Sequence, residues 1–151
     1  GSDAVVFAAG SAAGETSELD RKGTLRTVRA AEKAGVKRYV SISSIGASTG
    51  LSTRAMDAEM KDYYRQKRAA AKHIAGSSLD WTIVEPGELT DGAGTGYVTI
   101  SRHAIDAESV PRADVATVVV AVLAEPRSIG TALQLTRGTH PIAAALKSAL
   151  G

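Results

Sequence analysis

A tyrosine and a lysine at helical spacing are the residues of this sequence with the clearest potential for chemistry. Tyr63 and Lys67 lie four positions apart, so they share one face if this segment is a helix. An ammonium beside a phenol favours the phenolate. A tyrosine in that setting can donate or accept a proton while a carbonyl is reduced or an alcohol is oxidised. The competing interpretation is an ordinary pair of surface side chains on a helix.

Two serines follow an apolar run upstream of this pair. Ser43 and Ser44 come after Arg38-Tyr39-Val40-Ser41-Ile42, which has the composition of a strand. A serine at a strand end could hydrogen-bond the substrate oxygen that the tyrosine serves. We assign this role to Ser44 in preference to Ser43. Both serines could instead simply end the strand.

The elements that must position these side chains alternate along the chain. Residues 11–17 are small and polar and are expected to form a loop. The sequence predicts strands over 4–9, 38–43, 81–84, 97–100 and 132–136, and helices over 18–34, 57–75, 113–123 and 141–150. Strand–helix alternation of this kind is typical of an α/β, Rossmann-like, doubly wound parallel sheet. No internal repeat or linker divides residues 1–151, so we expect a single domain with no internal boundary.

Ligands of such sheets bind at the carboxyl ends of the strands. This rule directs attention to three segments, Ala8-Ala9-Gly10, Ser43-Ser44 and Glu85-Pro86-Gly87. The Tyr63–Lys67 helix follows the second of them, so its amino-terminal half should approach the same edge.

Composition excludes several other classes of function. A net charge of +2 is too small to indicate nucleic-acid or membrane binding. With no cysteine there is neither a disulfide framework nor a thiolate metal site, which fits a cytoplasmic protein. The three histidines have no metal-ligand spacing, and the Gly-x-Ser-x-Gly of a hydrolase elbow does not occur.

Six segments in order resemble the atypical short-chain dehydrogenase/reductases of the NAD(P)H-binding, NmrA-like kind. The fourth segment contains the Tyr-x-x-x-Lys of those proteins. The six segments are residues 3–10, 20–24 together with 34–40, 43–47, 63–67, 79–91 and 112–116. Each motif alone is weak, whereas six in the family's order are fairly specific.

The resemblance implies an NAD(P)H-dependent oxidoreductase that acts on an unknown small carbonyl or alcohol. It implies a catalytic set of Ser44, Tyr63 and Lys67, in which Lys67 also holds the hydroxyls of the nicotinamide ribose. The cofactor would be NADP or NAD. Its contacts would come from Ala8, Ala9, Gly10, Ser43, Lys67, Pro86, Gly87, Leu89 and Thr90.

Two other functions are compatible with the same motifs. One is a non-catalytic regulatory protein that senses NAD(P) and signals to a protein partner. The other is a nucleotide-sugar epimerase-like enzyme, because extended relatives share the serine and the Tyr-x-x-x-Lys. We rank the epimerase last, since the chain after Thr90 is short for a sugar-nucleotide lobe.

The Gly-rich phosphate-binding turn of the family does not occur in these 151 residues. We therefore expect the chain to represent the C-terminal part of the domain, without the N-terminal Gly-rich βαβ segment. Two consequences are expected: the chain alone binds NAD(P) poorly, and its first strand has an unpaired edge through which molecules could associate. Glu85 and Glu88 also depart from the family pattern and would repel a phosphate unless they point away from it.

Overall fold

The computed structural model describes residues 1–10 and 17–151. The loop expected over 11–17 therefore lies mostly outside the described residues. Among the described residues, six strands form one sheet, in the order β1 (Ala4–Phe7), β2 (Arg38–Ile42), β3 (Asp80–Pro86), β7 (Thr131–Arg137), β5 (Tyr97–Ser101) and β8 (His140–Pro141). The pairs β1–β2, β2–β3 and β3–β7 are parallel. This confirms the predicted Rossmann-like sheet.

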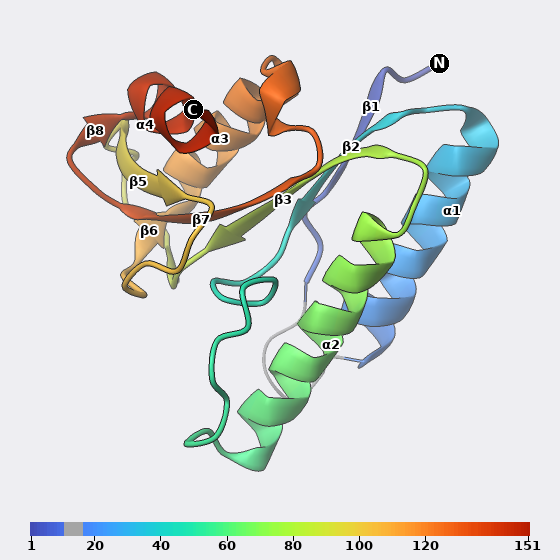
Figure 1. Cartoon of the computed structure of the whole chain (residues 1–151), viewed down its shortest axis with the longest axis horizontal. Helices are drawn as coiled ribbons and strands as arrows, with labels where there is room; N and C mark the ends of the chain where they lie inside the picture. Colours follow the sequence, from blue (N-terminus) through green and yellow to red (C-terminus); the bar gives the residue numbers. More distant parts are fainter. Residues whose placement is uncertain (11–16) are drawn as a thin grey trace.

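Helices cover both faces of this sheet (Figure 1). One face carries α1 (Thr24–Ala34) and α2 (Ala58–Ala75), and the other carries α3 (Arg112–Leu123) and α4 (Ile142–Leu150). A short helix η2 (Pro126–Ser128) precedes β7, and the strands β4 (Leu89–Thr90) and β6 (Val110–Pro111) pair beside the main sheet. None of the described helices is long and apolar enough to cross a membrane.

Neighbouring residues of the central strands face opposite layers, because side chains alternate along a strand. On β3, Ile83 packs with the α1 and α2 side chains Val28 and Ile74. Val84 packs with the α3 side chain Val118 on the other face. With both faces covered, the strand is apolar in its middle, as expected for a parallel sheet.

Local signals account for the ends of the helices that carry the site. The Asp57 carboxylate accepts a hydrogen bond of 2.8 Å from the amide of Met60 and caps α2, which satisfies one of the free N–H groups of the first turn. Gly35 ends α1 with a φ of 72°, a left-handed conformation that glycine adopts readily.

Besides adding the short strands β4, β6 and β8, the structure differs from the predicted elements in three places. The first strand ends at Phe7, so Ala8 and Ala9 follow it. The helix predicted from residue 18 opens as a π-helix, η1 (Ser17–Gly23), before α1. Strand β5 pairs antiparallel with β7. The reason is that the chain turns back after β3 and reaches β5 without an intervening helix.

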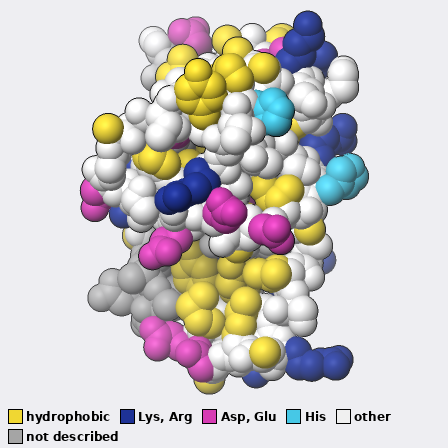
Figure 2. All heavy atoms as spheres, turned by 90° about the vertical axis from the view of Figure 1, so that its left-hand side faces the viewer, with side chains coloured by type: hydrophobic (Ala, Val, Ile, Leu, Met, Phe, Trp, Pro, Cys, Tyr) yellow, Lys and Arg dark blue, Asp and Glu magenta, His cyan; other side chains and the backbone are white. Residues whose placement is uncertain are grey.

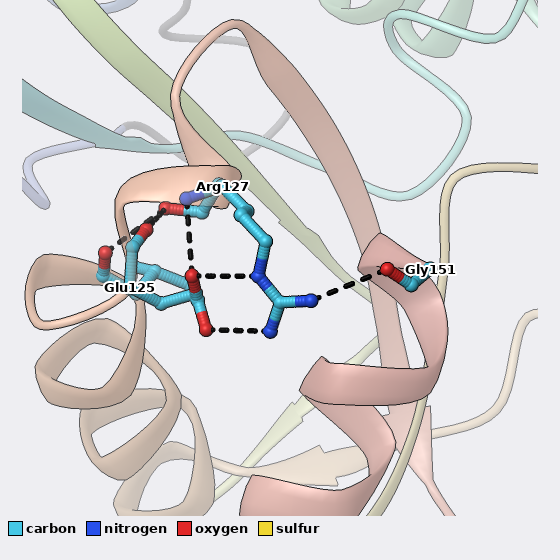
Figure 3. A network of polar contacts seen from close by, with 5 residues as sticks. Glu125, Arg127 and Gly151 are labelled. Atoms are coloured by element: carbon cyan, nitrogen blue, oxygen red, sulfur yellow. Dashed lines mark hydrogen bonds and ion pairs between the residues drawn. The ribbon is translucent and has the colours of Figure 1, made fainter.

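A surface network fixes the end of the chain (Figure 3). Arg127 donates to both carboxylate oxygens of Glu125 at 3.0 and 2.9 Å, and to the carbonyl of Gly151 at 3.2 Å. The hydrogen bonds from the Arg127 side chain lower the pKa of Glu125 to about 2. The network thus joins the end of α4 to the segment between α3 and β7.

Candidate functional site

Backbone hydrogen bonds bring the carboxyl ends of three strands to one edge of the sheet. The amide of Ser43 donates to the carbonyl of Val84 at 2.8 Å, and that of Ile45 donates to Pro86 at 2.9 Å. The amide of Gly87 donates to Leu135 at 2.9 Å. The predicted site segments after β2 and β3 therefore meet, with the end of β7 beside them.

Gly87 lies at a close approach between two segments of this edge. A Cβ atom at that position would collide with the carbonyl oxygen of Glu108. Glycine is required here because no side chain fits between the two backbones.

Helix α2 carries Tyr63 and Lys67 to this edge. The Lys67 ammonium lies 5.3 Å from the centroid of the Tyr63 ring. The neighbouring hydroxyl of Tyr64 donates to the carbonyl of Ile45 at 3.1 Å. Since Ile45 directly follows Ser44, this bond places the amino-terminal half of α2 against the serine loop.

The sequence did not indicate the closest partner of Lys67. The ammonium lies 2.7 Å from the carboxylate oxygen Oδ1 of Asp20, in an ion pair whose side chains are only 8% and 2% exposed. Asp20 belongs to a segment that supported the family resemblance, but no site role was assigned to it. The only available signal was an acidic residue just before Gly23-Thr24, and spacing alone does not connect positions 20 and 67.

The backbone of Gly10 lies close to this ion pair. A Cβ atom on Gly10 would lie 3.3 Å from the Lys67 Nζ atom and 3.4 Å from Asp20 Oδ1. A side chain at this position would crowd the ammonium, whereas a ligand can approach the bare backbone of Gly10 closely. Gly10 and Lys67 therefore fit the contact with a nicotinamide ribose that the resemblance implies.

Other predicted contact residues lie on the α3 side of the same edge. Ala8 and Leu89 line one hollow of about 320 Å³ together with Ile42 and Val115. Thr90 follows Leu89 in β4 and pairs with Pro111 of β6. Ala9 is exposed between the hollow and Gly10. The predicted cofactor residues therefore come from both sides of the strand ends.

Figure 2 shows the side of the molecule on which β5 and β8 lie, with hydrophobic side chains gathered in its lower half beneath several acidic groups. At the carboxyl edge, a small cavity of about 130 Å³ is lined by Ile45, Leu51, Ile105 and Gln134. The amide side chain of Gln134 is its buried polar group. Its Nε2 donates to Thr49 Oγ1 at 2.6 Å, and its Oε1 accepts from the amide of Ile105 at 3.0 Å.

Glu85 points beneath the serine loop. It is fully buried, and its Oε1 accepts a 2.7 Å hydrogen bond from the amide of Ser48. Its Oε2 is buried without a partner among the described residues. Glu88, by contrast, is exposed. Burial raises the pKa of the Glu85 carboxyl, and the hydrogen bonds from Ser48 and Gly46 oppose this effect in part.

Replacing Glu85 by glutamine should remove a pH dependence of stability. A raised pKa in the folded state means that the native protein holds the Glu85 proton more tightly than the unfolded chain does. The contribution of Glu85 to the free energy of unfolding is then most favourable below the ordinary pKa of 4.5 and is lost as the pH rises through the folded-state pKa. One proton can contribute a slope of at most about 1.4 kcal/mol per pH unit.

We expect Glu85→Gln to gain stability relative to wild type between acidic and neutral pH, as measured by urea unfolding at a series of pH values. Glu88→Gln, at an exposed position, is the matched control and should leave the wild-type slope unchanged. Parallel pH curves for wild type and Glu85→Gln would contradict the inferred effect of burial.

Comparison with known proteins agrees with this geometry. The model of a family described as NAD(P)H-binding matches residues 1–126. The chain belongs to this NAD(P)H-binding family. The family predicted from the six motifs is thereby confirmed, and the family description names the nicotinamide cofactor.

Individual relatives of this NAD(P)H-binding chain are longer than it is. It is 35% identical to a Bacillus subtilis protein named "Uncharacterized sugar epimerase YhfK", over 97% of this chain and 69% of the relative. It is 32% identical to the structure of the oxidoreductase ylbE from Lactococcus lactis, with a TM-score of 0.84, over 99% of this chain and 68% of that one. It is 26% identical to an anaerobilin reductase structure, ChuY from Escherichia coli O157:H7, with a TM-score of 0.76, over 89% and 63% of the two chains. The chain thus spans about two thirds of these relatives.

Proposed function

We propose that this NAD(P)H-binding chain is the catalytic part of an oxidoreductase that reduces a small carbonyl compound or oxidises the corresponding alcohol. The observation that supports this most strongly is the Lys67 ammonium held 5.3 Å from the Tyr63 ring centroid. The pair lies where the loop after β2 brings Ser44 to the same edge. The names of the Lactococcus and Escherichia relatives describe an oxidoreductase and a reductase.

Three side chains divide the work in this proposal. The Tyr63 hydroxyl donates a proton to the substrate oxygen during reduction and accepts it during oxidation. Ser44 donates a hydrogen bond to the same oxygen and fixes its position. The Lys67 ammonium, 5.3 Å from the centroid of the Tyr63 ring, binds the ribose hydroxyls. NADP or NAD, when bound, supplies or accepts the hydride.

The remaining contacts surround this centre. Gly10 and the backbone of Ala8 and Ala9 would contact the cofactor on one side, and Ser43 would contact it on the other. The residues after β3 would close the site around it; these are Pro86, Gly87, Leu89 and Thr90. We further propose that the chain forms one partial domain, acts in the cytoplasm and can associate through the edge of β1.

An epimerase-like function is the second candidate, because the Bacillus subtilis relative is named a sugar epimerase. An epimerase returns its cofactor to the starting redox state, whereas a reductase consumes NADPH or NADH in proportion to product. A regulatory sensor would bind the cofactor without turnover. A net change in absorbance at the nicotinamide band with carbonyl compounds identifies a reductase, and chromatography of nucleotide sugars for a newly formed epimer separates an epimerase from a sensor.

Cofactor affinity provides a direct test of the proposed site. We expect residues 1–151 alone to bind NADPH or NADH poorly, because the pyrophosphate normally binds to backbone N–H groups of a Gly-rich helix start. The contacts available here reach the ribose and nicotinamide only, and must offset the ordering of a flexible ligand. Titration calorimetry should compare this chain with the product of the complete reading frame.

Micromolar binding by the 151-residue chain would contradict the expected dependence on a Gly-rich turn. Failure of the complete product to bind either cofactor would contradict the proposed function itself. Binding without turnover of any carbonyl compound or alcohol would favour the regulatory alternative.

A further inference from the structure

The Asp20–Lys67 ion pair is buried to a degree that charged residues seldom reach. The two side chains are 2% and 8% exposed, and their closest atoms lie 2.7 Å apart. A buried charge is tolerated when it is paired and hydrogen-bonded. The Asp20 carboxylate therefore compensates the charge of the buried Lys67 ammonium.

An irregular turn of helix brings Asp20 to this position. Asp20 lies in the π-helix η1, and the hydroxyl of Thr24 donates to its carbonyl at 2.6 Å. Single π-helical turns are rare and often occur at functional sites. The α1 segment that follows packs its Val28 against Ala71 and Ile74 of α2. The two helices are thus fixed to one another, and the carboxylate projects toward Lys67.

Three groups confine the ammonium. From the Lys67 Nζ atom, the Asp20 carboxylate lies at 2.7 Å and the centroid of the Tyr63 ring at 5.3 Å. The backbone of Gly10 is also close, since a Cβ atom added there would lie 3.3 Å from Nζ. A lysine side chain has a flexible four-carbon stem and many rotamers. Of these three neighbours, only Asp20 is an anion, and it selects the rotamer that keeps the ammonium near both Tyr63 and Gly10.

We propose that Asp20 is a positioning residue, whose carboxylate holds the Lys67 ammonium in the pose required for the site. This role rests on the proposed function for its purpose, but the positioning itself concerns only residues of this chain. A purely structural ion pair between η1 and α2 is the alternative. In that case, loss of Asp20 would lower stability without a specific effect on what Lys67 binds.

Lysine ammonium NMR tests the positioning without any ligand. With lysine labelled by ¹⁵N, we expect one ammonium signal of the 151-residue chain to be protected from hydrogen exchange, and Lys67→Met to abolish it. Asp20→Asn should also abolish it, whereas Asp20→Glu should retain it. Asp62→Asn is the matched control, because Asp62 pairs with Arg65 on the exposed side of α2. No protected signal in wild type, or an unchanged signal in Asp20→Asn, would overturn the proposal. If Asp20→Asn fails to fold, the scalar coupling across the hydrogen bond between the Lys67 ammonium nitrogen and the Asp20 carboxylate carbon of wild type decides: its presence supports the proposal and its absence overturns it.

Cofactor affinity of the complete product separates positioning from stability. Asp20→Asn should weaken NADPH binding about tenfold or more, and in the Lys67→Met background it should have no further effect, because Asp20 acts through Lys67. Additive losses, or wild-type affinity in Asp20→Asn, would overturn the positioning role. A complete wild-type product that binds no cofactor, together with a protected Lys67 signal that Asp20→Asn abolishes, would contradict the proposed function and leave the positioning supported.

Discussion

Replacing Lys67 by methionine should lower the free energy of unfolding by about 3–5 kcal/mol, because it removes the ammonium that lies 2.7 Å from the buried Asp20 carboxylate. Methionine retains the unbranched, apolar stem of lysine, so the change mainly removes the charge. Asp20 is only 2% exposed and therefore gains little compensation from water. For a chain of this size the loss corresponds to a fall in melting temperature on the order of 10 °C. Urea unfolding at neutral pH measures it.

Two further variants make this result specific. Lys72→Met removes an exposed lysine on the same helix and should change the unfolding free energy by less than about 0.5 kcal/mol. Adding Asp20→Asn to Lys67→Met should restore part of the lost stability, since the buried negative charge is then removed together with the positive one. Equal effects of Lys67→Met and Lys72→Met would show that the ion pair is not buried in solution.

Replacing Tyr63 by phenylalanine should reduce turnover by the complete product about 10²–10⁴-fold, the range associated with a general acid or base. The aromatic ring and its contact with the Lys67 ammonium remain, so folding and cofactor affinity should change little. Tyr63 is half-buried, and its ring packs edge-on against Tyr64 with 5.4 Å between centroids. Steady-state rates with the best substrate of the carbonyl panel provide the measurement.

Tyr64→Phe is the matched control for Tyr63→Phe. It removes the hydrogen bond from the buried Tyr64 hydroxyl to the carbonyl of Ile45, and should therefore cost about 1 kcal/mol of stability. Its effect on proton transfer should be small by comparison. Full turnover in Tyr63→Phe would remove Tyr63 from the mechanism and favour the regulatory or another catalytic role for this edge.

The sequence by itself determined the local elements and the family. The runs at 38–43 and 81–84 predicted two strands of the sheet, which pair with one another in the structure. The spacing of Tyr63 and Lys67 placed both side chains on one face of a helix. These features were predictable because strand composition, helix periodicity and capping depend on residues close together in the chain.

The tertiary structure decided which distant groups meet. Asp20 and Lys67 are 47 positions apart, and the packing of α1 against α2 after a π-helical turn brings them together. Residue type alone left open whether Glu85 points toward a cofactor phosphate or away from it, whereas in the fold its buried carboxylate lies under the loop that holds Ser48. The antiparallel direction of β5 relative to β7 likewise follows from the tertiary course of the chain, which turns back after β3 and reaches β5 without an intervening helix. Such contacts depend on how whole elements pack and align, so residue type and local spacing do not specify them.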